Sequence, residues 1–135
     1  MASETQMRAA VQAYFDLFNA GDGAGIAALF ADDASLIDPV GTDPKSGKDT
    51  IAEFYDMATR AGTTLEQTGP TRIAHKSAAF AFKVHVKGIK AEDTAIDVEL
   101  PSGAMVIDVI DIFDFNDDGK ITHMRAYWGP SNISQ

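Results

Sequence analysis

An aspartate inside an apolar segment is the first residue of this sequence whose type and position could do chemistry. Asp111 lies in the segment 104–115, which is rich in β-branched and aromatic residues and is bounded on both sides by turn-forming residues. Such a segment predicts a long strand. Because side chains alternate between the two faces of a strand, Asp111 is the lone polar residue on its face. The other members of that face are apolar: Ile107, Val109, Phe113 and Phe115.

Two interpretations of Asp111 are open. A β-bulge could shift the register and turn the carboxyl toward water, where most aspartates lie. Alternatively, the carboxyl is buried, and its pKa rises because loss of hydration disfavours the charged form. A carboxylic acid that stays protonated at neutral pH can donate a hydrogen bond, and an active site is the best reason to keep one.

Two further polar residues lie on predicted elements that have an apolar face. Asp38 shares a strand face with Leu36, although an aspartate that starts a turn before Pro39 is the simpler interpretation. Tyr14 belongs to the apolar stripe of a predicted helix and is by default a core tyrosine, whose hydroxyl needs a partner or a cavity. An acid, a base and a hydroxyl together would suit proton abstraction next to a carbonyl. Two hydrogen-bond donors can stabilise the enolate oxygen while a carboxylate moves the proton.

Other chemistries find little support in the residues. His75, His85 and His123 are scattered and there is no cysteine, so no metal site is predicted. The segment 114–125 begins like a calcium loop, but Arg125 stands where a bidentate glutamate is required, which favours a hairpin turn. Neither a nucleophile elbow nor a phosphate-binding glycine loop is present, and no cofactor is expected.

Length and charge narrow the possible partners. The 135 residues suit one domain, spanning 1–135. A formal net charge of −9 argues against nucleic acid as a partner, because binding phosphates requires Lys and Arg. No signal peptide and no membrane-spanning segment is expected. With no cysteine available for disulfides, the cytoplasm is the default compartment, and a neutral, apolar small molecule is the expected ligand.

The elements that would position the candidate residues are helices first and strands afterwards. Apolar periodicity and capping signals predict helices over 3–20, from Asp22 to about 33, and over 48–60. Residues 129–135 are expected to be a tail. An α+β domain follows, with helices packed on one face of a curved antiparallel-rich sheet. The predicted strands are 34–41, 65–73 with an interruption at 69–70, 78–86, 94–100, 104–115 and 121–128.

From residue 7 to residue 130 the chain resembles the Δ5-3-ketosteroid isomerases of the NTF2-like (SnoaL-like) superfamily. Single segments are common across that superfamily, whereas the combination of Tyr14, Asp38 and Asp111 is specific to the isomerases. The resemblance implies a cone-shaped NTF2-like (cystatin-like) fold with a mixed sheet. The segments that carry it, in family order, are Val11 to Tyr14, 30–34, Asp38-Pro39-Val40-Gly41, 46–47, 51–55, 80–82, 108–111 and 124–128.

The resemblance also implies roles for individual residues. Asp38 would take a proton from the carbon between the ketone and the double bond and return it two carbons further along. Tyr14 and protonated Asp111 would hydrogen-bond the dienolate oxygen; ketosteroid isomerase is itself the established example of a carboxylic acid held neutral in an apolar site. Tyr55 would hydrogen-bond the oxyanion-hole tyrosine. The implied ligand is a steroid or another apolar ketone, no cofactor is needed, and a homodimer is expected. The implied pocket walls are Phe82, Val84 and Trp128, each equally well explained as core.

Three features depart from the family pattern, and two other function classes stay open. The segment 87–99 is longer than in the best-known members, Phe30 stands where some members have a further tyrosine, and Asp114 stands where members have a basic residue. The long segment concerns the outer hairpin, the dimer edge and substrate selectivity, and Phe30 implies that a chain of hydroxyls would end at Tyr55. None of the departures touches the three proposed catalytic positions. The same superfamily contains polyketide cyclases, dehydratases and epoxide hydrolases. A non-catalytic binding module, in which Asp111 and Tyr14 anchor a ligand carbonyl, is the other alternative.

Overall fold

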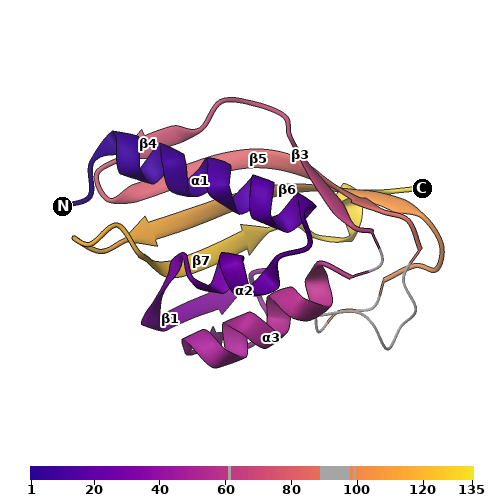
Figure 1. Ribbon diagram of the computed structural model, residues 1–135. Coiled ribbons are helices and arrows are strands. Elements are labelled where there is room, and N and C mark those ends of the chain that lie inside the picture. Colours follow the sequence, from indigo (N-terminus) through magenta and orange to yellow (C-terminus); the bar gives the residue numbers. More distant parts are fainter. Residues whose placement is uncertain (61, 89–97, 99) are drawn as a thin grey trace.

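The protein is an α+β domain in which helices pack on one mixed sheet (Figure 1). A computed structural model describes residues 1–60, 62–88, 98 and 100–135. Its helices are α1 (Glu4–Asn19), α2 (Gly23–Ala27) and α3 (Lys48–Ala58). Its strands are β1 (Phe30–Ile37), β2 (Lys45–Ser46), β3 (Thr64–Gln67), β4 (Arg72–Ala74), β5 (Ser77–Val86), β6 (Met105–Phe115), β7 (Ile121–Tyr127) and β8 (Ile133–Ser134).

The helices begin where the sequence predicts. Ser3 and Gln6 form the expected capping box at the start of α1, and the Asp22 carboxylate caps α2. Gly23 is required where α2 meets α3, because a Cβ there would lie 2.9 Å from the backbone nitrogen of Asp56. Close contact of the two helices fixes the position of α3, which carries Tyr55.

The prediction that the second helix continues to about residue 33 is wrong. The helix ends at Ala27, and the completely buried Phe30 already belongs to β1, where it pairs in parallel with Ile121. Asp32 and Asp33, at the end of the predicted helix, are exposed residues of β1, where its register with β7 shifts. The pairing of Phe30 with Ile121, a residue far away in the sequence, decides where the second helix ends. Helical periodicity cannot reveal such a partner.

The strand β6 lies in the middle of the sheet, paired antiparallel with β5 on one side and β7 on the other. Its pairing with β5 runs in continuous register from Asp114 to Met105. Burial alternates as predicted, with Ile107, Val109, Asp111, Phe113 and Phe115 all buried. The parallel pairing of β1 with β7 makes the sheet mixed. A turn at 116–119 joins β6 to β7. The sequence favours such a hairpin turn over a calcium loop.

The prediction of a C-terminal tail is also wrong. Residues Pro130–Asn132 form a 3-10 turn, and β8 then pairs antiparallel with β6 through Ile133 and Ser134. Ile133 packs against the core. The strand predicted over 94–100 and the long segment 87–99 lie mostly outside the described residues.

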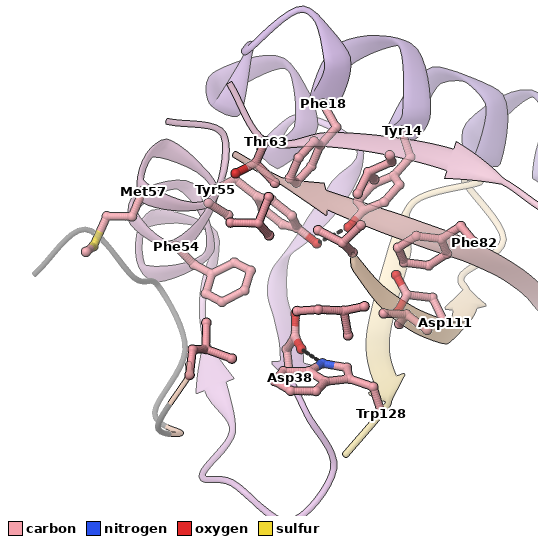
Figure 2. A pocket seen from close by; sticks show the side chains of 17 residues that line it. Tyr14, Phe18, Asp38, Phe54, Tyr55, Met57, Thr63, Phe82, Asp111 and Trp128 are labelled. Atoms are coloured by element: carbon pink, nitrogen blue, oxygen red, sulfur yellow. Dashed lines mark hydrogen bonds between the residues drawn. The ribbon is translucent and has the colours of Figure 1, made fainter. Parts of the chain in front are cut away.

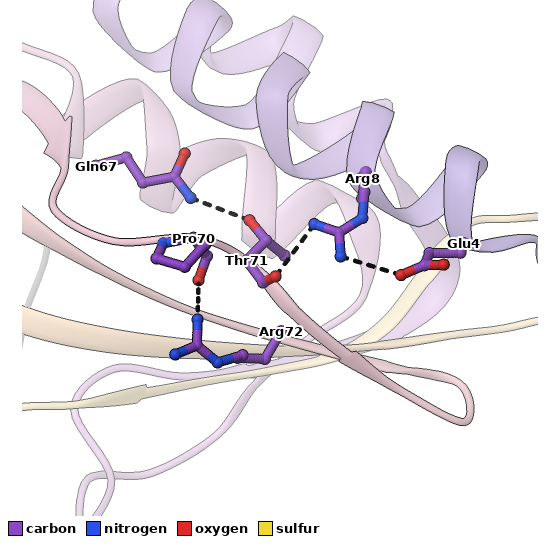
Figure 3. Close-up of polar contacts among 6 residues, drawn as sticks. All are labelled: Glu4, Arg8, Gln67, Pro70, Thr71 and Arg72. Atoms are coloured by element: carbon purple, nitrogen blue, oxygen red, sulfur yellow. Dashed lines mark hydrogen bonds and ion pairs between the residues drawn. The ribbon is translucent and has the colours of Figure 1, made fainter.

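Polar contacts fasten α1 to the connection between β3 and β4 (Figure 3). Arg8 donates a hydrogen bond to the carbonyl oxygen of Thr71 and forms an ion pair with Glu4. Gln67 donates to the hydroxyl of Thr71 across the same connection. Figure 1 shows α1 lying over the middle of the sheet and α3 beside β1. None of the helices in the described part of the chain has the length and hydropathy to cross a membrane.

Candidate active site

An apolar pocket opens between the helices and the buried face of the sheet (Figure 2). It holds about 730 Å³ of empty space when open solvent at its mouth is included. All seven residues singled out in the sequence line it: Tyr14, Asp38, Tyr55, Phe82, Val84, Asp111 and Trp128. They come from α1, α3, β5, β6 and the segments that follow β1 and β7.

Asp111 is a buried carboxyl group. The residue is 1% exposed, and neither carboxyl oxygen has a hydrogen-bond partner among the described residues. The register of β6 with β5 is unbroken here, where Asp111 pairs with Phe80, so the bulge interpretation is wrong. Burial, and to a lesser extent the charge of Asp38, raise the pKa of Asp111 well above its usual value. The raised pKa favours the neutral acid, which is the form that can donate a hydrogen bond.

Tyr14 and Tyr55 form a buried pair of hydroxyls. Their oxygens are 3.1 Å apart, and either one could be the donor. The Tyr14 ring lies edge-on against Phe113, with 5.1 Å between the ring centroids. Burial is the largest cause that raises the pKa of both tyrosines well above the ordinary value, so both hydroxyls keep their protons. Packing that holds the Tyr14 ring also fixes where its hydroxyl points.

Asp38 is held by a hydrogen bond that sequence reasoning missed. The indole nitrogen of Trp128 donates to its Oδ1 at 2.8 Å, and Figure 2 shows the two side chains next to each other with this bond drawn between them. The sequence suggested Trp128 only as an apolar wall. Burial raises the pKa of Asp38 to about 6, while the Trp128 hydrogen bond and the charge of Lys45 act in the opposite direction. Asp38 is only partly buried and is ionised at neutral pH.

The environments of the two carboxyl groups differ in a chemically useful way. Asp111 has no hydrogen-bond partner among the described residues, and its raised pKa favours the protonated form. Asp38 has the indole donor and the nearby positive charge of Lys45, which both favour its ionised form. Environments that push two pKa values apart assign one group as acid and the other as base. The site can thus move a proton with one carboxylate while neutral donors face a ligand oxygen.

Two residues of the pocket region carried no distinctive sequence signal. Lys45 on β2 places its amine 5.5 Å from the ring centroid of Phe54, a pocket residue. Thr63 lies after α3 and is buried in the pocket lining. A single lysine before a helix and a single threonine after a glycine are common in sequences, and only the assembled pocket shows where they lie. In the described residues no group of three or more His, Cys, Asp or Glu side chains is placed to hold a metal ion.

Comparison with known proteins gives the family. The SnoaL-like domain family matches residues 11–124. Steroid Delta-isomerase from Nocardioides simplex is 36% identical over 128 residues, which cover 95% of this chain and 94% of that protein. Epoxide hydrolase LasB from Streptomyces lasalocidi is 30% identical over 99% of this chain, although this chain spans only 45% of that protein.

A solved structure supports the same assignment. SalBIII, an epoxide hydrolase/cyclase-like enzyme with a role in pyran ring formation in the polyether salinomycin, superposes with a TM-score of 0.83 at 27% identity. The superposition covers 99% of this chain and 98% of that one. Three helices on a mixed, open sheet confirm the fold predicted from the sequence. The chain belongs to the SnoaL-like (NTF2-like) domain family, in which its relatives include a steroid Delta-isomerase.

Proposed function

We propose that this protein is a steroid Delta-isomerase, which moves the double bond of a 3-oxo-Δ5-steroid into conjugation with the ketone at Δ4. The observation that carries the proposal is the pairing, in one apolar pocket, of a neutral buried carboxyl with an ionised, partly exposed one. The relative named steroid Delta-isomerase, similar over almost the whole of both chains, supports the same reaction.

The reaction needs one proton to move and one oxygen to be stabilised. Asp38 removes a proton from the carbon between the ketone and the double bond, and the electron pair spreads onto the ketone oxygen as a dienolate. Tyr14 and Asp111 donate hydrogen bonds to that oxygen as its negative charge grows. Asp38 then returns the proton two carbons further along, so no proton is consumed and no cofactor is required.

The pocket walls account for affinity. Apolar side chains supply most of the lining, and burial of a fused-ring hydrocarbon against them is favourable by roughly 25 cal/mol for each Å² removed from water. Tyr55 orients the Tyr14 hydroxyl through the 3.1 Å contact, and Trp128 orients the carboxylate of the base. Binding and chemistry are therefore assigned to different residues of one site.

A second candidate function is opening of an epoxide by an internal hydroxyl or by water. Two relatives named for such chemistry favour it. Asp111, as a protonated acid, would donate its proton to the epoxide oxygen while Asp38 removes a proton from the attacking hydroxyl. The acid and base are the same as in the isomerase, so the substrate decides between the two reactions.

One assay separates the candidates. The expected result is a rise in ultraviolet absorbance from the conjugated enone when the protein is mixed with 5-androstene-3,17-dione. The rise should exceed that of an Asp38→Asn sample at the same concentration. Binding of the steroid without any rise would contradict the isomerase and leave a binding module, and turnover of an epoxide substrate in its place would favour the second candidate.

We also propose a homodimer in the cytoplasm. Ile110 on β6 and Tyr127 on β7 are register partners on the sheet face that the helices leave uncovered, and they are 49% and 45% exposed. Exposed apolar residues side by side are a feature of protein interfaces. This supports the dimer that the resemblance implies.

Lys45 should tune the base, and the pH dependence of catalysis tests this. Activity needs ionised Asp38, so kcat/KM of the protein should rise with pH through about 6 and then level off. Lys45 lowers the pKa of Asp38, so Lys45→Met should move the rise to higher pH and reduce activity more at pH 6 than at pH 8. Lys48→Met is the matched control, because Lys48 pairs with the exposed Asp32. An unchanged pH midpoint in Lys45→Met would show that its charge does not reach the base.

A further inference from the structure

Thr63 is an unusual residue in this pocket. Apart from the two tyrosines, the buried residues with a polar or charged side chain in the described part of the chain are Asp111 and Thr63, and Thr63 is 8% exposed. It lines the pocket. Its backbone N–H is bonded to the carbonyl oxygen of Arg60, whereas its hydroxyl forms no hydrogen bond with a described residue. Among the described residues the fully buried side-chain atoms without a partner are the two carboxyl oxygens of Asp111, so the Thr63 oxygen is accessible to water or a ligand in the pocket that it lines.

The sheet register places Thr63 far from the reacting end of the pocket. Asp111 pairs with Phe80 on β5, and Thr64 pairs with His85 on the same strand. Five residues of extended chain separate those two positions, which is about 17 Å between their backbones. Figure 2 shows the Thr63 and Asp111 side chains on different sides of the pocket. The spacing, reduced by the side chains that reach inward, is comparable with the length of a fused four-ring skeleton.

The remaining polar groups of the lining belong to the reacting end. Tyr14 and Tyr55 share a hydrogen bond, and Trp128 donates one to Asp38. The charge of Asp38 also reaches Asp111, whose pKa it helps to raise. The rest of the lining is largely apolar and includes Phe18, Leu65, Phe82, Val84 and Val86. A ligand held by its ketone at Asp111 would therefore lie against apolar walls, with the Thr63 hydroxyl as the polar group of the lining away from the reacting end.

We propose that Thr63 is a specificity-determining residue, whose hydroxyl binds a second oxygen at the end of the ligand opposite the reacting ketone. The inference rests on the proposed function for the orientation of the ligand. A threonine hydroxyl can donate and accept, so the subsite fits a carbonyl or a hydroxyl at the far ring of a steroid. The ligand class is a rigid apolar skeleton with one oxygen at each end.

Equilibrium binding of two stable Δ4-3-ketones tests the proposal without any turnover. Androst-4-ene-3,17-dione carries the second oxygen and androst-4-en-3-one lacks it. Thr63→Val removes the hydroxyl and keeps the shape, and should weaken binding of the dione by about 3- to 10-fold, the value of one neutral hydrogen bond. Binding of the 17-deoxo steroid should be unchanged, and Thr63→Ser should retain most of the preference for the dione.

A kinetic readout and a control variant sharpen the test. With 5-androstene-3,17-dione, Thr63→Val should raise KM and leave kcat close to its original value, because the hydroxyl does not touch the reacting atoms. Thr122→Val is the control, since its hydroxyl bonds to the carbonyl oxygen of Asp114 and lies outside the pocket lining. Its binding of both steroids should be unaltered.

The possible outcomes separate this inference from the proposed function. Equal weakening of both ligands by Thr63→Val would show a packing role and overturn the subsite, and so would no weakening of either. Failure of the unaltered protein to bind either steroid would overturn it as well. The unaltered protein could also bind both steroids without isomerising 5-androstene-3,17-dione. If Thr63→Val then loses the preference for the dione, the result would support the subsite and refute the isomerase.

Discussion

Asp38→Asn should reduce isomerisation of 5-androstene-3,17-dione by about 10⁴-fold, the upper end of what a positioned base contributes. The residue is assigned both the removal and the return of the proton, so its loss affects both steps. The measurement is the rate of enone absorbance under saturating steroid. Binding of androst-4-ene-3,17-dione should change little, because the apolar walls and the donors Tyr14 and Asp111 remain.

Asparagine is the appropriate replacement because it preserves the local geometry. Its side-chain carbonyl can still accept the hydrogen bond from Trp128, which is 2.8 Å from Oδ1 of Asp38, yet it cannot accept a proton at neutral pH. Asp33→Asn serves as the matched control, since Asp33 is exposed on β1. Turnover that survives in Asp38→Asn would exclude this carboxylate as the base and transfer the role to another group of the pocket.

Local patterns were sufficient to predict much of the fold. Ser3 and Gln6 signal the start of α1 within four residues of sequence, and alternation along β6 places Asp111 on the apolar face before any partner strand is known. The structure confirms both. Such features depend on the period of a helix or strand, which neighbouring residues determine.

Features that depend on distant residues could not be read in the same way. The second helix ends early because Phe30 pairs with Ile121, and the C-terminal residues form β8 because Ile133 pairs with Ile107. Local sequence carries no record of such partners. Residues 129–135 look like a tail in the sequence because the strand they complete is more than twenty positions away.

The candidate site follows the same division. The resemblance supplied Tyr14, Asp38 and Asp111 together, and the pocket contains all three. The hydrogen bond from Trp128 to Asp38 joins residues ninety positions apart, and the positions of Lys45 and Thr63 depend on how α3, β2 and β3 assemble. Chemistry-bearing residues could be chosen from type and context, while the contacts that tune them required the tertiary structure.

Asp111→Leu should lower kcat by about 10² to 10³-fold, which is the usual loss when one donor to an oxyanion is removed. Leucine keeps the branching at Cγ without a proton to donate, and Asp111→Asn, which keeps the volume and an N–H donor, should lose less. The measurement is again the enone rate, with binding of androst-4-ene-3,17-dione as the check that the pocket is intact. Equal losses in the two variants would contradict a hydrogen-bonding role.

The same substitution should raise stability, and its pH dependence gives an independent test of protonation. The pKa of Asp111 is well above its usual value of 3.8 in the folded protein, so the folded state binds a proton that the unfolded state has released. The free energy of unfolding must then fall as pH rises above about 4, by about 1.4 kcal/mol per pH unit, until the folded-state pKa is passed. Asp38, with a pKa of about 6, lowers the free energy of unfolding with rising pH only up to that pH.

Asp111→Leu should therefore unfold at higher denaturant concentration than the unaltered protein at pH 7, and its stability should fall with pH only up to about 6. A stability profile parallel to that of the unaltered protein would mean that Asp111 is ionised in the fold, and an ionised carboxylate there could not donate to a dienolate oxygen.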